Sequence, residues 1–272
     1  MSSAPLRGLR LAVSTLTVWP LRGPAVIDRD AGRAAMLWAP LVGLLVGLPA
    51  ALVVYAGRRY LSSLYEDQLL VPAVLGVTTL VVLTRGLHVD GLADTVDGLA
   101  SYRPAQEALE IMRRGDVGPL GVAAVVLTLL LQAAALSSAI VAHHGTVGLL
   151  VAVLTGRCAL TLACRAGTPV AAGSTLGAVV VGTVPRAAAA LVAVLTVTGC
   201  GVAGSLDRHT LDPRFEVAQA LVAAVAGLAA AELLRRHALR RLDALSGDVL
   251  GALLEVSTTV ALLVMSAQHV HR

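Results

Sequence analysis

Long runs of mostly apolar residues alternate with short polar segments along the chain. The first clear run, Ala34–Ala56, has 23 residues, about the length that a helix needs to cross ~30 Å of hydrocarbon. Seven further runs follow: Leu69–Thr84, Val117–Ala142, Thr146–Cys164, Val170–Val184, Ala187–Leu206, Phe215–Leu234 and Val249–Ala267. The pattern predicts an all-α protein, in which residues 1–272 form a single integral membrane domain built as a polytopic helix bundle.

The arginine distribution predicts how many of these runs cross the membrane. Arginines occur near the N-terminus, in the segment 85–116 and in a predicted loop at 235–241. All three regions lie in the cytoplasm, as the positive-inside rule requires, if one of the eight runs does not cross. The Gly- and Thr-rich stretch 170–185 is the best candidate for that re-entrant or surface segment. We therefore expect about seven transmembrane helices, with the N-terminus inside and the C-terminus outside.

Composition excludes several classes of protein. Hydrophobic residues make up 57% and charged residues 14% of the chain, whereas about a quarter of a soluble domain is charged. A net charge of +4 with only seven aromatic residues argues against a nucleic-acid partner. There is no lysine, so a P-loop nucleotide-binding motor is excluded. Cys158, Cys164 and Cys200 lie in apolar stretches and are expected to be small buried side chains.

The acidic residues are unevenly distributed. Six of the 17 fall between residues 90 and 116, and none occurs between 117 and 206. In a helix, Asp90, Asp94 and Asp97 would share one face, where their charges would repel unless a cation lay between them. Ligands that are all oxygens favour Mg²⁺ or Mn²⁺, which most often act on phosphates. The alternative is a solvated loop whose acidic side chains face water.

Other charged residues flank this acidic string. His88 precedes it and is either a ligand or proton relay, or a structural histidine. Glu107 and Glu110 belong to a second short predicted helix and fit simple helix-end charges. Arg113 and Arg114 close that helix and suit bidentate binding of phosphate oxygens, although they could equally set topology at the headgroups.

A second acidic patch, Asp248 and Glu255, lies far along the chain on one predicted helix face. Glu255 falls inside an apolar run, so it should face the bundle interior or a wet cavity. Arg157 is also within a run, where it could hold phosphate or extend to the interface. Carboxylates and arginines gathered at one membrane face favour displacement at a phosphoryl or pyrophosphate centre. A cation or metabolite transporter is the alternative.

The sequence resembles the cobalamin synthase family, the adenosylcobinamide-GDP ribazoletransferases. The resemblance is carried by His-Val-Asp-Gly-Leu-Ala-Asp-Thr-Val-Asp-Gly at 88–98, by Glu-Ile-Met-Arg at 110–113 with Val-Gly-Pro-Leu-Gly at 117–121, and by Gly-Asp-Val-Leu-Gly at 247–251. Pro-Leu-Val-Gly at 40–43 is also similar. The CDP-alcohol phosphotransferases are a weaker alternative, because Asp90-Gly91-Leu-Ala-Asp94 does not match their Asp-Gly-x-x-Ala-Arg string and lacks its arginine.

The resemblance implies an enzyme of the bacterial cytoplasmic (inner) membrane. It would join adenosylcobinamide-GDP to α-ribazole or α-ribazole 5′-phosphate, giving adenosylcobalamin or its phosphate and GMP, with Mg²⁺ as the expected metal. Its cytoplasmic catalytic segment would be about 85–117. A homo-oligomer is compatible with the sequence, and the lipid bilayer and the small-molecule substrates are the expected partners.

The same resemblance suggests roles for individual residues. Asp90, Asp94 and Asp97 would hold the metal against the donor pyrophosphate. The expected phosphate-binding arginines are Arg85, Arg113, Arg114 and Arg157. The proton of the attacking hydroxyl would pass to His88, Asp116 or Asp248.

Overall fold

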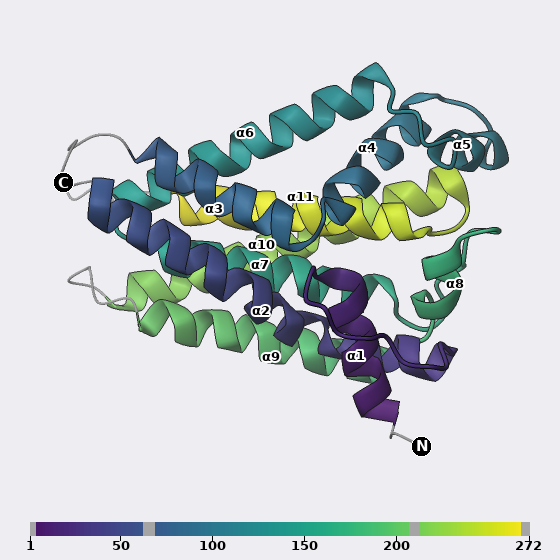
Figure 1. Ribbon diagram of the computed structural model, residues 1–272, viewed down its shortest axis with the longest axis horizontal. Coiled ribbons are helices and arrows are strands. Elements are labelled where there is room, and N and C mark those ends of the chain that lie inside the picture. Colours follow the sequence, from purple (N-terminus) through teal and green to yellow (C-terminus); the bar gives the residue numbers. More distant parts are fainter. Residues whose placement is uncertain (1–3, 62–68, 207–212, 268–272) are drawn as a thin grey trace.

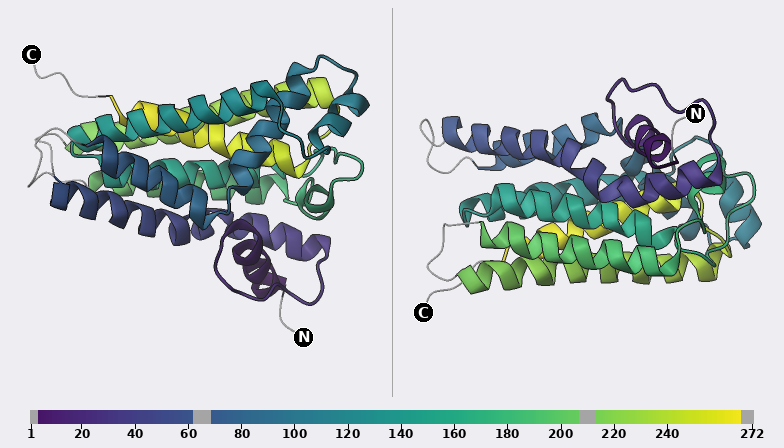
Figure 2. Two further views of the ribbon diagram at one scale, coloured as in Figure 1. Left: turned by 45° about the horizontal axis from the view of Figure 1, so that its top comes forward. Right: turned by 90° about the horizontal axis from the view of Figure 1, so that it is seen from below.

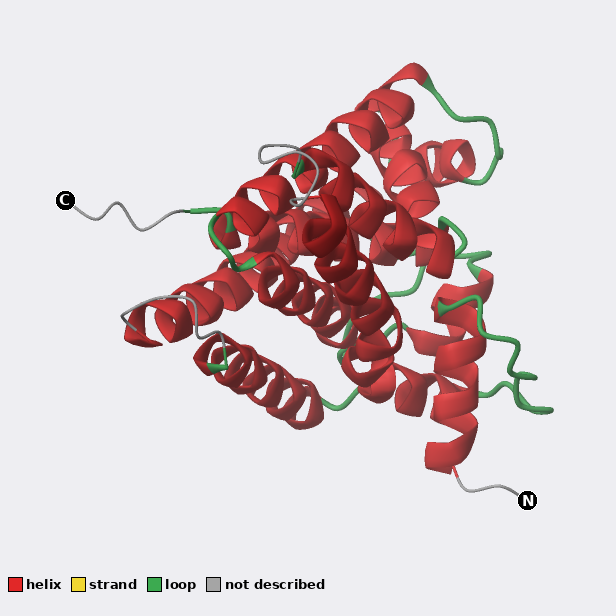
Figure 3. Cartoon of the chain, turned by 60° about the vertical axis from the view of Figure 1, so that its left-hand side comes forward, coloured by secondary structure: helices red, strands yellow, loops and turns green. Residues whose placement is uncertain are grey.

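The computed structural model describes residues 4–61, 69–206 and 213–267, and helices dominate these ranges (Figure 1). The helices are α1 (Ala4–Leu16), α2 (Arg29–Leu61), α3 (Leu70–Leu83), α4 (Leu87–Ala100), α5 (Ala105–Met112), α6 (Pro119–Val141), α7 (Gly145–Ala163), α8 (Thr175–Val180), α9 (Arg186–Ser205), α10 (Pro213–Leu242) and α11 (Gly247–Met265). The expected all-α polytopic bundle is confirmed, as the cartoon in Figure 3 also shows.

Six of these helices are long and apolar enough to cross a membrane: α2, α6, α7, α9, α10 and α11. A seventh crossing comes from α3 and α4 if the two count as one broken span, bent by 87° between them. The count agrees with the predicted number of about seven. The stretch 170–185, expected not to cross, contains only α8, which has six residues and is too short to do so.

The long helices run side by side along the long axis of the molecule, and most of their connections lie at its two ends (Figures 1 and 2). The start of α2, the helices α5 and α8 and the start of α11 lie together at the right-hand end of Figure 1. The last turn of α11 lies at the opposite end. We call the right-hand end the α5/α8 end.

One expectation for this end is wrong. The arginines at 235–241 were expected in a loop, but α10 continues through them to Leu242. Cationic side chains are favourable in the last turns of a helix, where the carbonyl ends of the peptide dipoles lie. Arginine also has good helix propensity, so charge alone does not end the helix.

Small residues allow the central helices to approach closely. Gly43 and Gly47 of α2 face α7, where a Cβ on Gly43 would lie 2.9 Å from Cγ of Arg157. This is the small-xxx-small packing that is common between membrane helices. Large apolar side chains instead point outward from the bundle, as Leu52 on α2 and Leu130 on α6 do with more than 60% of their surface exposed. Such outward surfaces suit contact with lipid.

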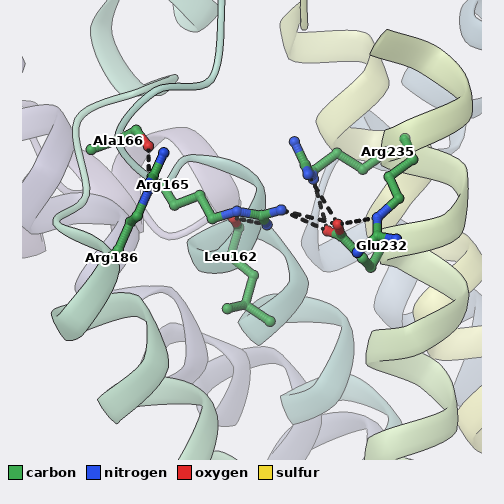
Figure 4. A network of polar contacts seen from close by, with 7 residues as sticks. Leu162, Arg165, Ala166, Arg186, Glu232 and Arg235 are labelled. Carbon is green, nitrogen blue, oxygen red and sulfur yellow. Dashed lines mark hydrogen bonds and ion pairs between the residues drawn. The ribbon is translucent and has the colours of Figure 1, made fainter. Parts of the chain in front are cut away.

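An ion-pair network ties α7 to α10 near the α5/α8 end (Figure 4). The Glu232 carboxylate accepts hydrogen bonds from Arg165 at 3.0 Å, and from Arg235 and Arg236 at 2.8 Å. Arg186, at the start of α9, donates to the carbonyl of Ala166 in the same region. Arg165 is therefore engaged in helix–helix packing.

The N-terminal helix is attached to the start of α2. Arg7 donates to Asp28 at 2.7 Å, and Asp28 accepts from the backbone N–H of Ala31 at 2.7 Å. The Ala31 hydrogen bond and the Arg7 guanidinium hold the pKa of the Asp28 carboxyl below its usual value. One face of α1, including Leu11 and Leu16, is buried.

Candidate active site

Two consecutive left-handed residues create the bend before α4. Arg85 has φ of 55° and Gly86 of 68°, and the Gly86 N–H donates to the carbonyl of Val81 at 2.8 Å. Glycine adopts this conformation without strain, and the residue ends α3 in the manner of a helix C-cap. The acidic string then folds as the helix α4, as its spacing predicted.

Glycines bring α4 into backbone contact with α11. A Cβ on Gly91 would lie 2.6 Å from the carbonyl oxygen of Asp248, and one on Gly251 would lie 3.0 Å from that of His88. Only residues without a side chain permit this crossing. It places Asp248 beside Asp90, so one carboxylate of the acidic string and one of the second acidic patch share a site although about 160 residues separate them.

A cavity of about 300 Å³ opens beside this crossing; we call it the main cavity. Seven polar or charged side chains line it: His88, Asp90, Arg113, Ser174, Thr175, Ser246 and Asp248. The remaining walls are mostly apolar and include Leu16, Met36, Leu109, Met112, Leu160 and Leu250. The hollow at the α5/α8 end is thus mixed in character, and its polar side chains lie on or next to α4, α5, α8 and α11.

The sequence reasoning missed the two serines. Ser246 is the N-cap of α11, and its hydroxyl donates to Asp248 at 3.1 Å. Ser174 caps α8 and also accepts from the backbone N–H of Gly247 at 3.3 Å. Serine directly before an apolar helical run is an N-cap signal, so their capping could have been predicted. Their meeting at one cavity could not.

Asp97 occupies a different environment from Asp90. Its carboxylate accepts hydrogen bonds from the backbone N–H groups of Gly118 at 2.7 Å and Gly121 at 2.8 Å. A Cβ on Gly121 would lie only 2.3 Å from the Asp97 side chain. The first turn of α6 therefore forms a close-fitting anion site around this carboxylate, as helix N-termini commonly do.

Asp94 lies between these two environments. The charges of Asp90, Asp97 and Asp248 all act on its carboxylate. In the part of the chain that the structure describes, no three His, Cys, Asp or Glu side chains form a ready-made metal cage. Mg²⁺ seldom needs one, because it usually takes one or two carboxylates and completes its shell with water and substrate phosphate. The donor set at the main cavity fits that chemistry.

A second polar group lies deeper in the bundle. Arg157 and Glu255 are almost fully buried, and Glu255 accepts a hydrogen bond from Gln132 at 2.8 Å. Together with His88 and Thr258 they line a pocket of about 30 Å³. Glu255 faces the interior, as the sequence predicted, and His88 is the residue that lines both this pocket and the main cavity.

The remaining predicted site residues lie outside the main cavity. Arg114 and Asp116 are exposed in the connection between α5 and α6. Arg85 lies on the other side of α4, on a wider hollow of about 710 Å³ that we call the outer groove. Asp90 and Leu87 line the outer groove as well as the main cavity.

The family model for cobalamin-5-phosphate synthase matches residues 8–266, nearly the whole chain. The chain belongs to this family. The three groups of motifs that carry the resemblance, at 88–98, at 110–113 with 117–121 and at 247–251, are the segments that build the main cavity and the α4–α6 contact.

Curated relatives agree with the family assignment. The chain is 44% identical to an adenosylcobinamide-GDP ribazoletransferase of Frankia casuarinae, over 94% of this chain and 93% of the relative. It is 40% identical to the protein of the same name from a Nocardioides species, over 95% of this chain and 98% of the relative. The corresponding Pseudomonas savastanoi protein is 32% identical over 94% and 97%. No solved structure is significantly similar to the chain.

The structure of this cobalamin synthase family member brings some predicted residues together and separates others. His88, Asp90, Arg113 and Asp248 share the main cavity. Arg157 and Glu255 lie in the deeper pocket. The metal-binding, phosphate-binding and proton-transfer roles assigned from the sequence stay predictions.

Proposed function

We propose that this protein joins adenosylcobinamide-GDP to α-ribazole or its 5′-phosphate, releasing GMP and completing the nucleotide loop of cobalamin. The observation that carries the proposal is the meeting of Asp90, Asp248 and Arg113 at one cavity in a chain of this family. Carboxylates with a guanidinium suit a substrate that carries a pyrophosphate.

The carboxylates at the α4–α11 crossing are the residues that would hold Mg²⁺. Asp90 and Asp248 line the cavity and Asp94 lies within reach of both charges. When bound, the ion would neutralise charge on the pyrophosphate and orient it for in-line displacement. Asp97 is the least suited of the four aspartates, because α6 already binds both of its oxygens.

The protein groups then have separate tasks. A hydroxyl of the acceptor ribose attacks the phosphorus on the corrinoid side, a new O–P bond forms, and the bond to the bridging oxygen breaks so that GMP leaves with that oxygen. We assign the hydroxyl proton to His88, since it is the histidine that lines the cavity. Arg113, whose guanidinium lies beside Gly173 at the cavity wall, would bind the phosphate oxygens.

We further propose that the α5/α8 end faces the cytoplasm of a bacterial inner membrane. The arginines of α10 and those of the α5–α6 connection gather at this end, as the positive-inside rule predicts. Nucleotide-activated substrates are cytoplasmic, which gives the same orientation.

The test is GMP release from adenosylcobinamide-GDP by the purified protein in lipid nanodiscs. Release should require both α-ribazole 5′-phosphate and Mg²⁺ and should yield a cobalamin product in equal amount. The same preparation with a CDP-alcohol donor should release no CMP. Ligand flux into proteoliposomes without GMP release would overturn the proposal in favour of transport.

A further inference from the structure

Two hollows of unequal size flank the start of α4. The main cavity, about 300 Å³, lies on the side of α5, α8 and α11, and the outer groove, about 710 Å³, lies between α4 and α6. Asp90 and Leu87 line both hollows, so one turn of helix forms the wall between them. A reaction with two substrates has use for two compartments that meet at one carboxylate.

We infer that the main cavity binds the acceptor, with its apolar base inside and its ribose at Asp90, while the outer groove binds the corrinoid end of the donor. The inference rests on the proposed function and adds to it which hollow takes which substrate. The pyrophosphate would then lie across Asp90, between Arg85 on the groove side and Arg113 on the cavity side.

Size separates the two substrates. A volume of 300 Å³ is at the lower end of small-molecule sites, which span roughly 300–1,000 Å³. A nucleoside with a bicyclic base fits a hollow of this size. A corrin ring with its peripheral amides is several times larger and fits only a wider, more open surface such as the outer groove.

The chemistry of the walls separates the acceptor base from guanine, the other base present. Met36, Leu109, Met112 and Leu160 are among the apolar side chains that line the main cavity. Guanine placed against these side chains would leave the polar atoms on its edge without hydrogen-bond partners, which is unfavourable. A benzimidazole-type base is flat and has few polar atoms, and thioethers pack well against such rings. The cavity therefore favours the acceptor base.

The outer groove has the complementary character. Its lining includes Val117, Val122 and Val126, each about half exposed, with Arg85 and Asp90 at one side. An apolar floor beside a single guanidinium suits a large amphipathic ligand that ends in a phosphate. The corrinoid-GDP donor has this form.

Two matched pairs of variants test the assignment. Ala171→Leu places a larger side chain in the wall of the main cavity, and Ala178→Leu makes the same change at an exposed position on α8 outside it. Val126→Trp narrows the outer groove, and Leu127→Trp makes a similar change one residue further along α6, outside the groove. Each protein is purified in nanodiscs and its KM is measured for both substrates.

Each of the two test variants is expected to change KM for one substrate and not for the other. Ala171→Leu should raise KM for α-ribazole 5′-phosphate about tenfold or more, since added methyl groups in a fitted pocket discriminate by about 10–200-fold. Its KM for adenosylcobinamide-GDP should change less than about twofold. Val126→Trp should do the reverse, and Ala178→Leu and Leu127→Trp should match the parent protein.

Binding without turnover provides the second readout. Equilibrium dialysis with labelled α-ribazole 5′-phosphate, in the absence of donor, should show the same loss of affinity in Ala171→Leu, and GMP should not displace the label. Displacement by GMP, or a rise only in the donor KM of Ala171→Leu, would overturn the assignment and place the nucleotide in the main cavity. If the parent protein binds the acceptor and Ala171→Leu binds it equally well, the inference fails while the proposed function stands. Absence of any GMP release by the parent protein is instead a failure of the proposed function.

Discussion

The two ends of α4 each carry an aspartate, and the two aspartates have different roles. At the start of the helix, Asp90 lies at the wall between two hollows and beside Asp248. Two turns later, Asp97 is held by the backbone N–H groups of Gly118 and Gly121. One carboxylate remains available to a ligand, whereas the other serves as an anchor for α6.

The difference comes from the neighbouring helices. Helix α11 places its own N-terminal carboxylate, that of Asp248, beside Asp90, so negative charge accumulates there. Helix α6 presents free N–H groups to Asp97, so the charge is compensated. Accumulated charge invites a cation and substrate, while compensated charge stabilises packing.

The largest effect is expected at the start of the helix. Asp90→Asn should lower turnover by about 100-fold or more, because the site loses a charge that positions the pyrophosphate. A loss of this size is usual when a group of this kind is removed from an active site. Its unfolding temperature should remain near that of the parent, since no helix contact depends on that charge. The measurement is GMP release together with thermal unfolding in detergent. Full turnover by Asp90→Asn would contradict the role of Asp90 in the reaction.

The crossing itself should be the next most sensitive feature. Gly91→Ala would place a Cβ 2.6 Å from the Asp248 carbonyl, so α4 and α11 must separate, and turnover should fall about tenfold as the site loses its geometry. Gly199→Ala on α9 is the matched control, since a Cβ there meets nothing within 4 Å. That variant should retain activity. Equal effects of the two alanines would show that helix propensity, and not the crossing, explains the result.

A substitution at the other end of α4 should affect stability more than turnover. Asp97→Asn keeps one acceptor oxygen but loses the charge and turns an amide group toward an N–H, so the free energy of unfolding should fall by about 1–3 kcal/mol. Activity of the folded fraction should fall less than in Asp90→Asn. Parallel thermal scans and GMP-release assays of the two variants measure this contrast. A turnover loss as large as that of Asp90→Asn, without loss of stability, would return Asp97 to the group of metal ligands.

The smallest effect is expected just beyond α4. Tyr102 is 83% exposed, and the guanidinium of Arg241 lies 5.5 Å from its ring centre, a contact that links this end of α4 to α10. Exposed cation–π pairs contribute about 0.5–1 kcal/mol, so Tyr102→Leu should lower stability by no more than this and leave KM unchanged. A measurable change in KM would show that the substrate-binding site reaches beyond the main cavity to Tyr102.

Much of the site was predictable from local pattern. The spacing of the three aspartates identified a helix with a carboxylate face, and Glu255 was expected inside the bundle because a charge facing lipid is costly. Asp116 and Arg114, by contrast, could not be placed relative to the cavity. Nothing in the local sequence distinguishes an exposed connecting residue from a lining one when both follow the same short helix.

The sequence by itself determined the all-α membrane architecture, the number of crossings and the position of the acidic string, because hydrophobic run length and helical spacing are local properties. Only the tertiary structure decided that Asp248 joins Asp90, that Asp97 faces the start of α6 and that Ser174 and Ser246 reach the same cavity. These outcomes depend on which helices cross at which glycines. A helix crossing is a relation between distant segments, so identical residues on one helix face can acquire opposite roles.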